Sequence, residues 1–151
     1  MTATAIQDGQ TKGHGVAHSP DDHLPQACEV WQLPGRSRWS PREARNRAVE
    51  LCRSQGLEGE TADDLAVIVT ELTTNAIVHA PSDTVCVSVI LDACEAHVLV
   101  IDQGCDLPSS NMQPEDDEHG RGLFLVEELS DRFVRLSAGD GTVAWAHMSF
   151  G

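Results

Sequence analysis

The chain has 151 residues, of which 40% are hydrophobic, which is enough material for one domain with a buried core. It carries 24 acidic and 10 basic residues, and the resulting net charge of −14 repels nucleic-acid backbones and anionic membrane surfaces. The sequence holds neither an apolar run of membrane-helix length nor a basic, apolar leader at its start. We therefore expect a cytoplasmic protein that binds neither nucleic acid nor membranes.

Residues 1–27 are rich in Gly, His, Asp and Pro and lack apolar periodicity, which predicts a disordered extension before a domain at 28–151. The extension contains His14, His18 and His23. These histidines would share a metal only if the segment were helical, and its composition favours solvated side chains instead. The chain has five cysteines, which are Cys28, Cys52, Cys86, Cys94 and Cys105. An odd set without a C-x-x-C pair argues against a disulfide framework and a zinc knuckle, so we expect reduced thiols that mostly serve in packing.

The first half of the domain predicts one strand and two helices. CEVWQLPG at 28–35 is typical of a strand that ends at Pro-Gly. SPRE then has the pattern of a capping box with proline at the first helical position, and it predicts a helix over 40–55 that ends at Gly56. A second helix is predicted over 61–80, because acidic residues fill its first turn and Pro81 follows its end.

The second half alternates strands with one short helix. TVCVSVIL at 84–91 and HVLVID at 97–102 are β-branched runs with a short connection, which predicts an antiparallel pair. Residues 103–119 lose periodicity and carry an acidic run, as expected of a long loop that acts as a lid. A helix over 122–131 and a closing hairpin over 132–150 follow. This order predicts an α+β two-layer α/β sandwich with a mostly antiparallel mixed sheet and helices on one face.

Two glycines flank an arginine where the third helix begins, in GRGLFLVEEL at 120–129. Glycine inside a helix costs roughly 1 kcal/mol relative to alanine, so such a pair indicates backbone that another group approaches closely. The free N–H groups of a helix start suit an anionic group. A first turn with incidental glycines is the alternative, and this segment by itself does not decide between the two.

On the second helix, Glu71 and Asn75 are four residues apart and lie on one face, about 40° apart around the axis. They border the main apolar stripe, which consists of Leu65, Ile68, Val69, Leu72 and Ala76. An amide oxygen is a suitable ligand for Mg²⁺, and a carboxylate one turn away could orient or deprotonate a nucleophile. The alternative is that both residues simply face solvent.

Asp102 ends an apolar strand, and Gly104 follows two residues later. A carboxylate at a strand end, walled by valine and isoleucine, can accept a hydrogen bond from an amino group such as that of adenine. An aspartate that merely starts a turn is the alternative, because this residue is common at strand ends.

Taken in order, these segments resemble the conserved boxes of the GHKL, or histidine-kinase-like, ATPase superfamily. ELTTNAIVHA at 71–80 is similar to its asparagine box, VIDQG at 100–104 to its first glycine box, and HGRGLFLVEEL at 119–129 to its second. GTVAWAHMSF at 141–150 is similar to its closing strand. The resemblance covers about residues 29–150 and implies a Bergerat-type ATP-binding fold with ATP and Mg²⁺ as ligands.

The resemblance also implies roles for the residues that match the boxes. The implied nucleotide contacts are Asn75, Asp102, Gly104, Gly120, Arg121, Gly122, Leu123 and Thr142. Among them, Asn75 would hold Mg²⁺ and Asp102 would bind the adenine amine, while Glu71 would be the catalytic general base. The glycines would let the backbone come close to the base and the phosphates. His79 also fits the asparagine box, and we interpret it as a packed residue at the helix end.

One position departs from the superfamily pattern. Where the first glycine box often reads D-x-G-x-G, this chain has Asp106 at the last position. A carboxylate then replaces a flexible glycine beside the expected triphosphate site, where like charges repel. Weak nucleotide binding is therefore an open alternative.

Within the superfamily the chain most resembles the bacterial anti-sigma-factor serine/threonine kinases of the sporulation and general-stress type. This resemblance implies a protein that binds a sigma factor or similar regulator and phosphorylates a serine on an antagonist protein. Arg45 in the first helix would contact the partner, and an ordinary surface arginine is the alternative. A non-catalytic ATP-binding or partner-binding module, and an isolated histidine-kinase ATPase domain, are the other candidate functions. The sequence leaves open whether the chain forms a homodimer.

Overall fold

The computed structural model describes residues 26–103, 113–114, 121–138 and 141–151, and all structural statements below concern these residues. The strands are β1 (Ala27–Pro34), β2 (Thr84–Leu91), β3 (Glu95–Ile101), β4 (Gln113–Pro114), β5 (Arg132–Ala138) and β6 (Gly141–Ser149). The helices are α1 (Ser40–Ser54), α2 (Glu60–His79) and α3 (Arg121–Leu129). No helix in the described part of the chain is both long and apolar enough to span a membrane.

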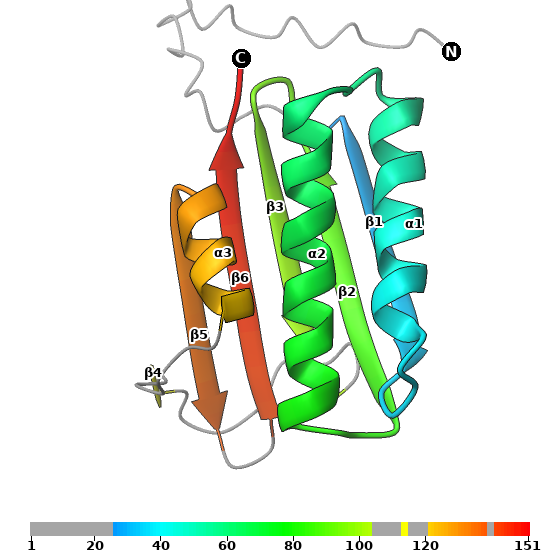
Figure 1. The fold of residues 1–151 in the computed structure, drawn as a ribbon, viewed down its shortest axis with the longest axis vertical. Helices are drawn as coiled ribbons and strands as arrows, with labels where there is room; N and C mark the ends of the chain where they lie inside the picture. The colour runs from blue at the N-terminus through cyan, green and yellow to red at the C-terminus, as the bar shows by residue number, and fades with distance from the viewer. Residues whose placement is uncertain (1–25, 104–112, 115–120, 139–140) are drawn as a thin grey trace, which may run out of the picture.

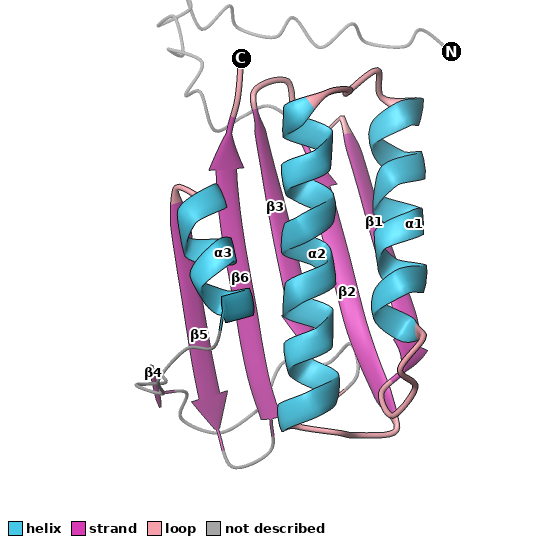
Figure 2. Cartoon of the chain, viewed as in Figure 1, coloured by secondary structure: helices cyan, strands magenta, loops and turns pink. Residues whose placement is uncertain are grey.

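The described strands form one sheet in the order β1-β2-β3-β6-β5-β4, and each of their pairings is antiparallel. The three helices lie side by side over one face of this sheet (Figures 1 and 2). The predicted two-layer α+β sandwich is therefore confirmed. The pairing of β4 with β5 was not predicted, since β4 lies within the segment expected to be an irregular loop.

Alternation along β3 separates the two faces of the sheet. Ala96, Val98 and Val100 are buried in the core beneath the helices, whereas Glu95 and His97 are only half-buried. Successive side chains of a strand point to opposite faces, so Glu95 and His97 belong to the face without helices. The outer face of β3 therefore carries the polar side chains of Glu95 and His97, while its inner face is apolar.

Helix α2 lies over the middle of the sheet and packs against both α1 and α3. Its predicted apolar stripe is buried throughout, and consists of Leu65, Ile68, Val69, Leu72 and Ala76. Glu71 and Asn75 are half-buried at the edge of this stripe. The period of the helix thus places the pair where α2 meets a neighbouring element rather than in open solvent.

The prediction for the start of α1 is wrong, and the prediction for its end is confirmed. The predicted capping box is wrong: the Ser40 hydroxyl donates to the Pro34 carbonyl at 2.6 Å, and no side chain caps the helix start. Ser40 is 1% exposed, so its hydroxyl needs a partner within the protein, and the Pro34 carbonyl provides it. The predicted end at Gly56 is confirmed, with a φ of 72°. The Leu57 amide donates to the Cys52 carbonyl at 2.9 Å, as in a Schellman motif.

The predicted bounds of two helices need correction. Helix α2 begins at Glu60, one residue before the predicted start. Helix α3 ends at Leu129, two residues before the predicted end, because Asp131 bonds to β6 instead. The Asp131 amide donates to the His147 carbonyl at 2.8 Å, and its carboxylate accepts a hydrogen bond from the Ser149 amide at 2.5 Å.

The cysteines do not share one environment. Cys86 is disulfide-bonded, with its partner outside the described residues, so the expectation of reduced thiols is wrong at this position. An odd count argues against a framework but does not exclude one bond. Cys28 and Cys94 are free and exposed, and Cys52 is free and buried. Burial raises the pKa of the Cys52 thiol, as expected of a packing residue.

Candidate nucleotide site

Segments that are distant in the sequence meet at one end of the molecule, which is the lower end in Figure 1. The end of α2, the end of β3 and the start of β6 all lie there, and α3 begins above them. This end therefore collects residues from the predicted asparagine box, the first glycine box and the closing strand. The topology, rather than any local pattern, brings them together.

A pocket of about 160 Å³ lies between α2 and α3. Its lining residues are Glu71, Thr74, Asn75, Val78, His79, Gly122 and Leu123. The predicted general base and metal ligand thus share one pocket with the predicted phosphate-binding helix start. An amide oxygen and a carboxylate are both suitable ligands or organisers for a hydrated Mg²⁺. The pair does not simply face solvent, because both half-buried side chains line this pocket.

Gly122 has a specific steric role in this pocket. A Cβ atom built at this position would overlap the Oε2 atom of Glu71. The group that approaches the backbone most closely here is therefore the Glu71 carboxylate of the protein itself. A carboxylate beside the first turn of α3 is also favoured by the positive end of the helix dipole. Gly122 consequently lets Glu71 occupy the pocket next to the start of α3.

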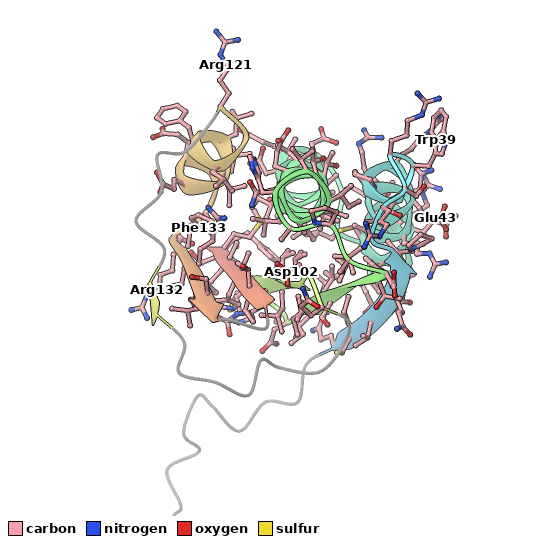
Figure 3. All side chains as sticks on the ribbon, turned by 90° about the horizontal axis from the view of Figure 1, so that it is seen from below. Trp39, Glu43, Asp102, Arg121, Arg132 and Phe133 are labelled. Atoms are coloured by element: carbon pink, nitrogen blue, oxygen red, sulfur yellow. The ribbon has the colours of Figure 1, made fainter. Side chains whose placement is uncertain are left out.

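Asp102 is buried at the end of β3, with an exposure of 2% (Figure 3). Its Oδ1 atom accepts a hydrogen bond from the Thr142 amide at 2.9 Å, and its own amide donates to the Thr142 carbonyl at 3.2 Å. A Cβ at Gly141 would lie 3.0 Å from Oδ1, so glycine permits this close pairing. Asp102 thus extends the contact between β3 and β6 and does not merely start a turn.

The second carboxylate oxygen of Asp102, Oδ2, is buried and has no hydrogen-bond partner among the described residues. Burial raises the pKa of Asp102, while hydrogen bonds from Thr142 act in the opposite direction. A buried acceptor without a donor is costly, so a ligand that donates a hydrogen bond would be favoured there. The amino group of adenine is such a donor, and the chain's own residues therefore fit an adenine nucleotide.

The other predicted site residues differ in burial, and some lie outside the described part of the chain. Arg121 is exposed, and Figure 3 shows its side chain extending away from the rest of the domain. Leu123 lines the pocket but is 5% exposed and belongs to the core, so it anchors α3. His79 is exposed in the pocket wall, and the prediction of a packed histidine is wrong. Gly104, Gly120 and most of the predicted lid lie outside the described residues, as does Asp106.

A second, larger groove lies between α1 and α2, with a volume of about 400 Å³. It is lined by Arg38, Trp39, Pro41, Arg42, Arg45, Thr70, Thr74, Ile77 and Val78. Trp39 and Val78 are 58% and 63% exposed, and together they give this groove an apolar surface open to solvent. Sequence reasoning identified Arg45 but missed these two residues, although Val78 lies off the apolar stripe of α2. Thr74 and Val78 line both this groove and the pocket beside Glu71.

The sandwich fold, the buried acceptor at the end of β3 and the Glu71–Asn75 pocket together offer groups that fit a nucleotide. The family model of the histidine kinase-like ATPase domain matches residues 36–148, which is most of the chain. The chain therefore belongs to the histidine kinase-like ATPase domain family. No curated protein is significantly similar to it.

Proposed function

We propose that this domain binds ATP with Mg²⁺ and acts as a regulatory serine/threonine kinase of the anti-sigma-factor type. It would capture a sigma factor or similar regulator and phosphorylate a serine on the antagonist of that complex. The observation that carries this proposal is the pocket that unites Glu71, Asn75 and Gly122. Membership of an ATPase family supports the nucleotide, and the pocket supports the phosphotransfer.

The nucleotide would be held by groups of complementary chemistry. Asp102 offers its buried Oδ2 atom to the adenine amine, and Thr142 holds the other carboxylate oxygen in place. The Asn75 amide oxygen would bind Mg²⁺, which neutralises phosphate charge in a chain whose own net charge is −14. The N–H groups at the start of α3 would be donors to the phosphates.

Glu71 would be the proton acceptor of the transfer. The serine hydroxyl oxygen attacks the γ-phosphorus of ATP and forms the new O–P bond. The bond from that phosphorus to the bridging oxygen breaks, and its electron pair leaves with ADP. The serine proton passes to the Glu71 carboxylate, which stands beside Gly122 in the pocket.

The groove between α1 and α2 is the proposed partner surface. Arg38 lies over the Trp39 ring at 4.9 Å from its centroid, and Arg45 lines the same groove. Exposed aromatic and arginine side chains are typical of the residues that dominate binding energy at interfaces. Because Thr74 and Val78 also line the pocket beside Glu71, a partner bound here would adjoin the nucleotide site.

A non-catalytic ATP-binding module is the second candidate. It is favoured by the outward orientation of Arg121, which supplies no charge to the pocket in this structure, and by Asp106 in the sequence of the first glycine box. The two candidates differ in one measurable property, because only the kinase transfers phosphate to a protein.

Three variants separate nucleotide binding, transfer and partner capture. Asn75→Ala removes the amide ligand, so Mg²⁺-ATP affinity and transfer should both fall. Glu71→Ala removes only the proton acceptor, so ATP should still bind while transfer falls on the order of 10²-fold or more. Arg45→Glu should weaken partner capture and leave ATP affinity unchanged. The measurements are calorimetric ATP affinity, sigma-factor pull-down and labelled phosphate on the antagonist.

Glu128→Ala is the matched control, because Glu128 is an exposed carboxylate on α3 that does not line the pocket. It should behave as wild type in all three assays. If Glu71→Ala transfers phosphate at the wild-type rate, Glu71 is not the base. If the wild-type chain binds ATP but transfers no phosphate to any co-encoded antagonist, the non-catalytic module is the better account.

A further inference from the structure

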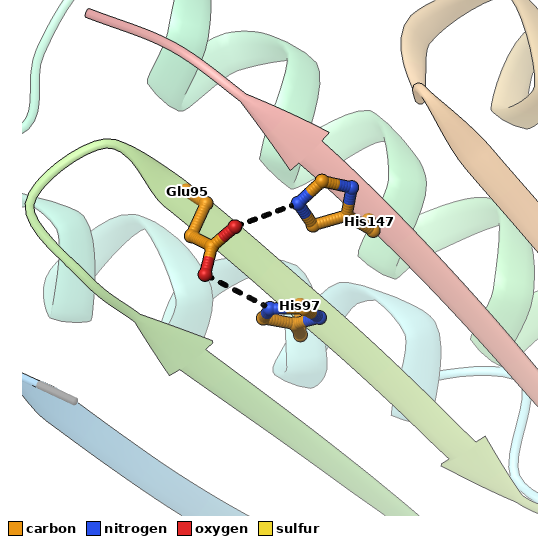
Figure 4. A group of neighbouring side chains, drawn as sticks. All are labelled: Glu95, His97 and His147. Carbon is orange, nitrogen blue, oxygen red and sulfur yellow. Dashed lines mark hydrogen bonds and ion pairs between the residues drawn. The ribbon is translucent and has the colours of Figure 1, made fainter. Parts of the chain in front are cut away.

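Glu95, His97 and His147 form a cluster on the sheet face without helices (Figure 4). Glu95 and His97 come from β3, and His147 is the direct cross-strand partner of His97 on β6. The two imidazole rings are 4.8 Å apart between centroids. All three side chains are half-buried, so they are held by the sheet and still reachable from solvent. The nucleotide site uses none of them.

The distances within this cluster are near those of a set of metal ligands. The Glu95 Oε2 atom is 3.0 Å from His147 Nε2, and the Glu95 Oε1 atom is 3.7 Å from His97 Nε2. One ligand atom from each of the three residues lies within 4.8 Å of the others. Zinc–ligand bonds of about 2.0–2.1 Å in tetrahedral geometry separate two ligand atoms by roughly 3.3 Å. Small side-chain rotations would therefore bring the three atoms around one ion.

We propose that Glu95, His97 and His147 bind one divalent transition-metal cation of the Zn²⁺ class, with a fourth position open to water or to a side chain of another protein. Two imidazoles and one carboxylate suit Zn²⁺ better than Mg²⁺ or Ca²⁺, which take oxygen ligands. The net charge of −14 also attracts a cation.

The neighbouring charges modulate this site in opposite directions. Arg132 on β5 is the cross-strand partner of His147, and its positive charge disfavours a cation. Asp131 lies beside His147, since its amide donates to the His147 carbonyl at 2.8 Å, and its negative charge favours a cation. The metal site and the nucleotide site are separate, because Asp102 follows the far end of β3, about 24 Å from Glu95 at 3.4 Å per residue.

The fluorescence of Trp145 should report metal binding at the proposed site. Its indole N–H donates to His97 Nδ1 at 3.2 Å, so in neutral His97 the ring proton is on Nε2. A metal on Nε2 moves this proton to Nδ1, which can then no longer accept from Trp145. Metal binding should therefore break the indole hydrogen bond and change the fluorescence of Trp145. The Trp145→Phe variant identifies the part of the signal that comes from this residue.

The test is calorimetric titration of the full chain with Zn²⁺. The starting protein carries Cys28→Ser, Cys94→Ser and alanine at His14, His18 and His23, which removes exposed thiols and tail histidines as competing ligands. We expect one Zn²⁺ per chain and a change in Trp145 fluorescence. His147→Ala and Glu95→Gln should each weaken binding by roughly tenfold or more. His79→Ala is the matched control and should retain the affinity.

Circular dichroism of each variant shows whether it has folded, and Glu95→Gln preserves size if His147→Ala does not fold. The proposal is overturned if the starting protein binds no Zn²⁺, since the cluster is then only a hydrogen-bonded network. It is also overturned if the folded Glu95→Gln variant keeps the full affinity. Equal affinity for Mg²⁺ would exclude the proposed class of cation.

Discussion

Two carboxylates at opposite ends of β3 have opposite environments. Asp102, just past the end of the strand, is 2% exposed and keeps one oxygen without a partner among the described residues. Glu95, at the start, is half-buried and bonds to His147 at 3.0 Å. Burial raises the pKa of Asp102, whereas the hydrogen bond with His147 lowers the pKa of Glu95. The Asp102 carboxylate thus has one oxygen without a hydrogen-bond donor among the described residues, whereas the Glu95 carboxylate is already paired with His147.

The difference shows that position in the sheet, rather than residue type, determines what a carboxylate can bind. At the Asp102 end, the Thr142 amide on β6 bonds to one carboxylate oxygen, and the other, buried oxygen favours a donor such as an amino group. At the Glu95 end, imidazoles from two strands share an accessible face, which suits a cation. Three measurements test this contrast.

The largest expected effect is that of Asp102→Asn on ATP binding. The amide oxygen can still accept from the Thr142 amide, so the variant should fold normally. The amide nitrogen replaces the unpaired oxygen and presents donors to the donating adenine amine, so affinity should fall by roughly 100-fold or more. Glu95→Gln is the matched control and should bind ATP as wild type. Calorimetry that gives Asp102→Asn the wild-type ATP affinity would remove the adenine assignment.

Gly122→Ala should have an intermediate effect. The added Cβ would overlap Glu71 Oε2, so the carboxylate must move within the pocket. Phosphotransfer should fall by about tenfold or more if Glu71 is the positioned base. Stability should not fall, because alanine gains about 1 kcal/mol over glycine inside a helix. Thermal unfolding and transfer rates, measured together, check this result, and a large loss of stability would instead identify a packing role for Gly122.

The smallest expected effect is on the pH dependence of stability, where the two carboxylates should act with opposite signs. The pKa of Glu95 is below its ordinary value of 4.5, so its stabilising contribution is present above that value and is lost as the pH falls through the lowered pKa. The pKa of Asp102 is above its ordinary value of 3.8, so its contribution is present below that value and is lost as the pH rises through the raised pKa.

Chemical unfolding between about pH 3 and 6 measures this contrast. Glu95→Gln should lose less stability than wild type as the solution is acidified. Asp102→Asn should lose less stability than wild type as the pH is raised from the acidic end. If both variants shift the profile in the same direction, the assignment of opposite environments to the two ends of β3 is wrong.

Much of the fold could be predicted because its signals are local and periodic. The stripe from Leu65 to Ala76 predicted α2 and its buried face, and alternation predicted β2 and β3. The errors occur where a distant group competes with a local pattern. The Ser40 hydroxyl bonds to Pro34 rather than to its own helix, and Asp131 bonds to β6 rather than extending α3. Neither partner is adjacent in the sequence.

The candidate site was predicted in part for the same reason. Glu71 and Asn75 share a helix face by spacing alone, and Asp102 follows an apolar strand. That Gly122 accommodates the Glu71 carboxylate could not be predicted, since 51 positions in the sequence separate them. The exposure of Trp39, Val78 and His79 was also missed, because periodicity describes a helix face but not what covers it.

Hydrophobic periodicity acts over a few residues, so the sequence alone is enough to predict the elements, their buried faces and the residue types available for chemistry. Which of those residues meet depends on how the elements pack, and no local pattern specifies that. Because β3 pairs with β6 in antiparallel register, Thr142 forms a hydrogen bond with Asp102 at one end of β3, and His147 forms one with Glu95 at the other. Register is a property of two strands together, and the two opposite carboxylate environments follow from it.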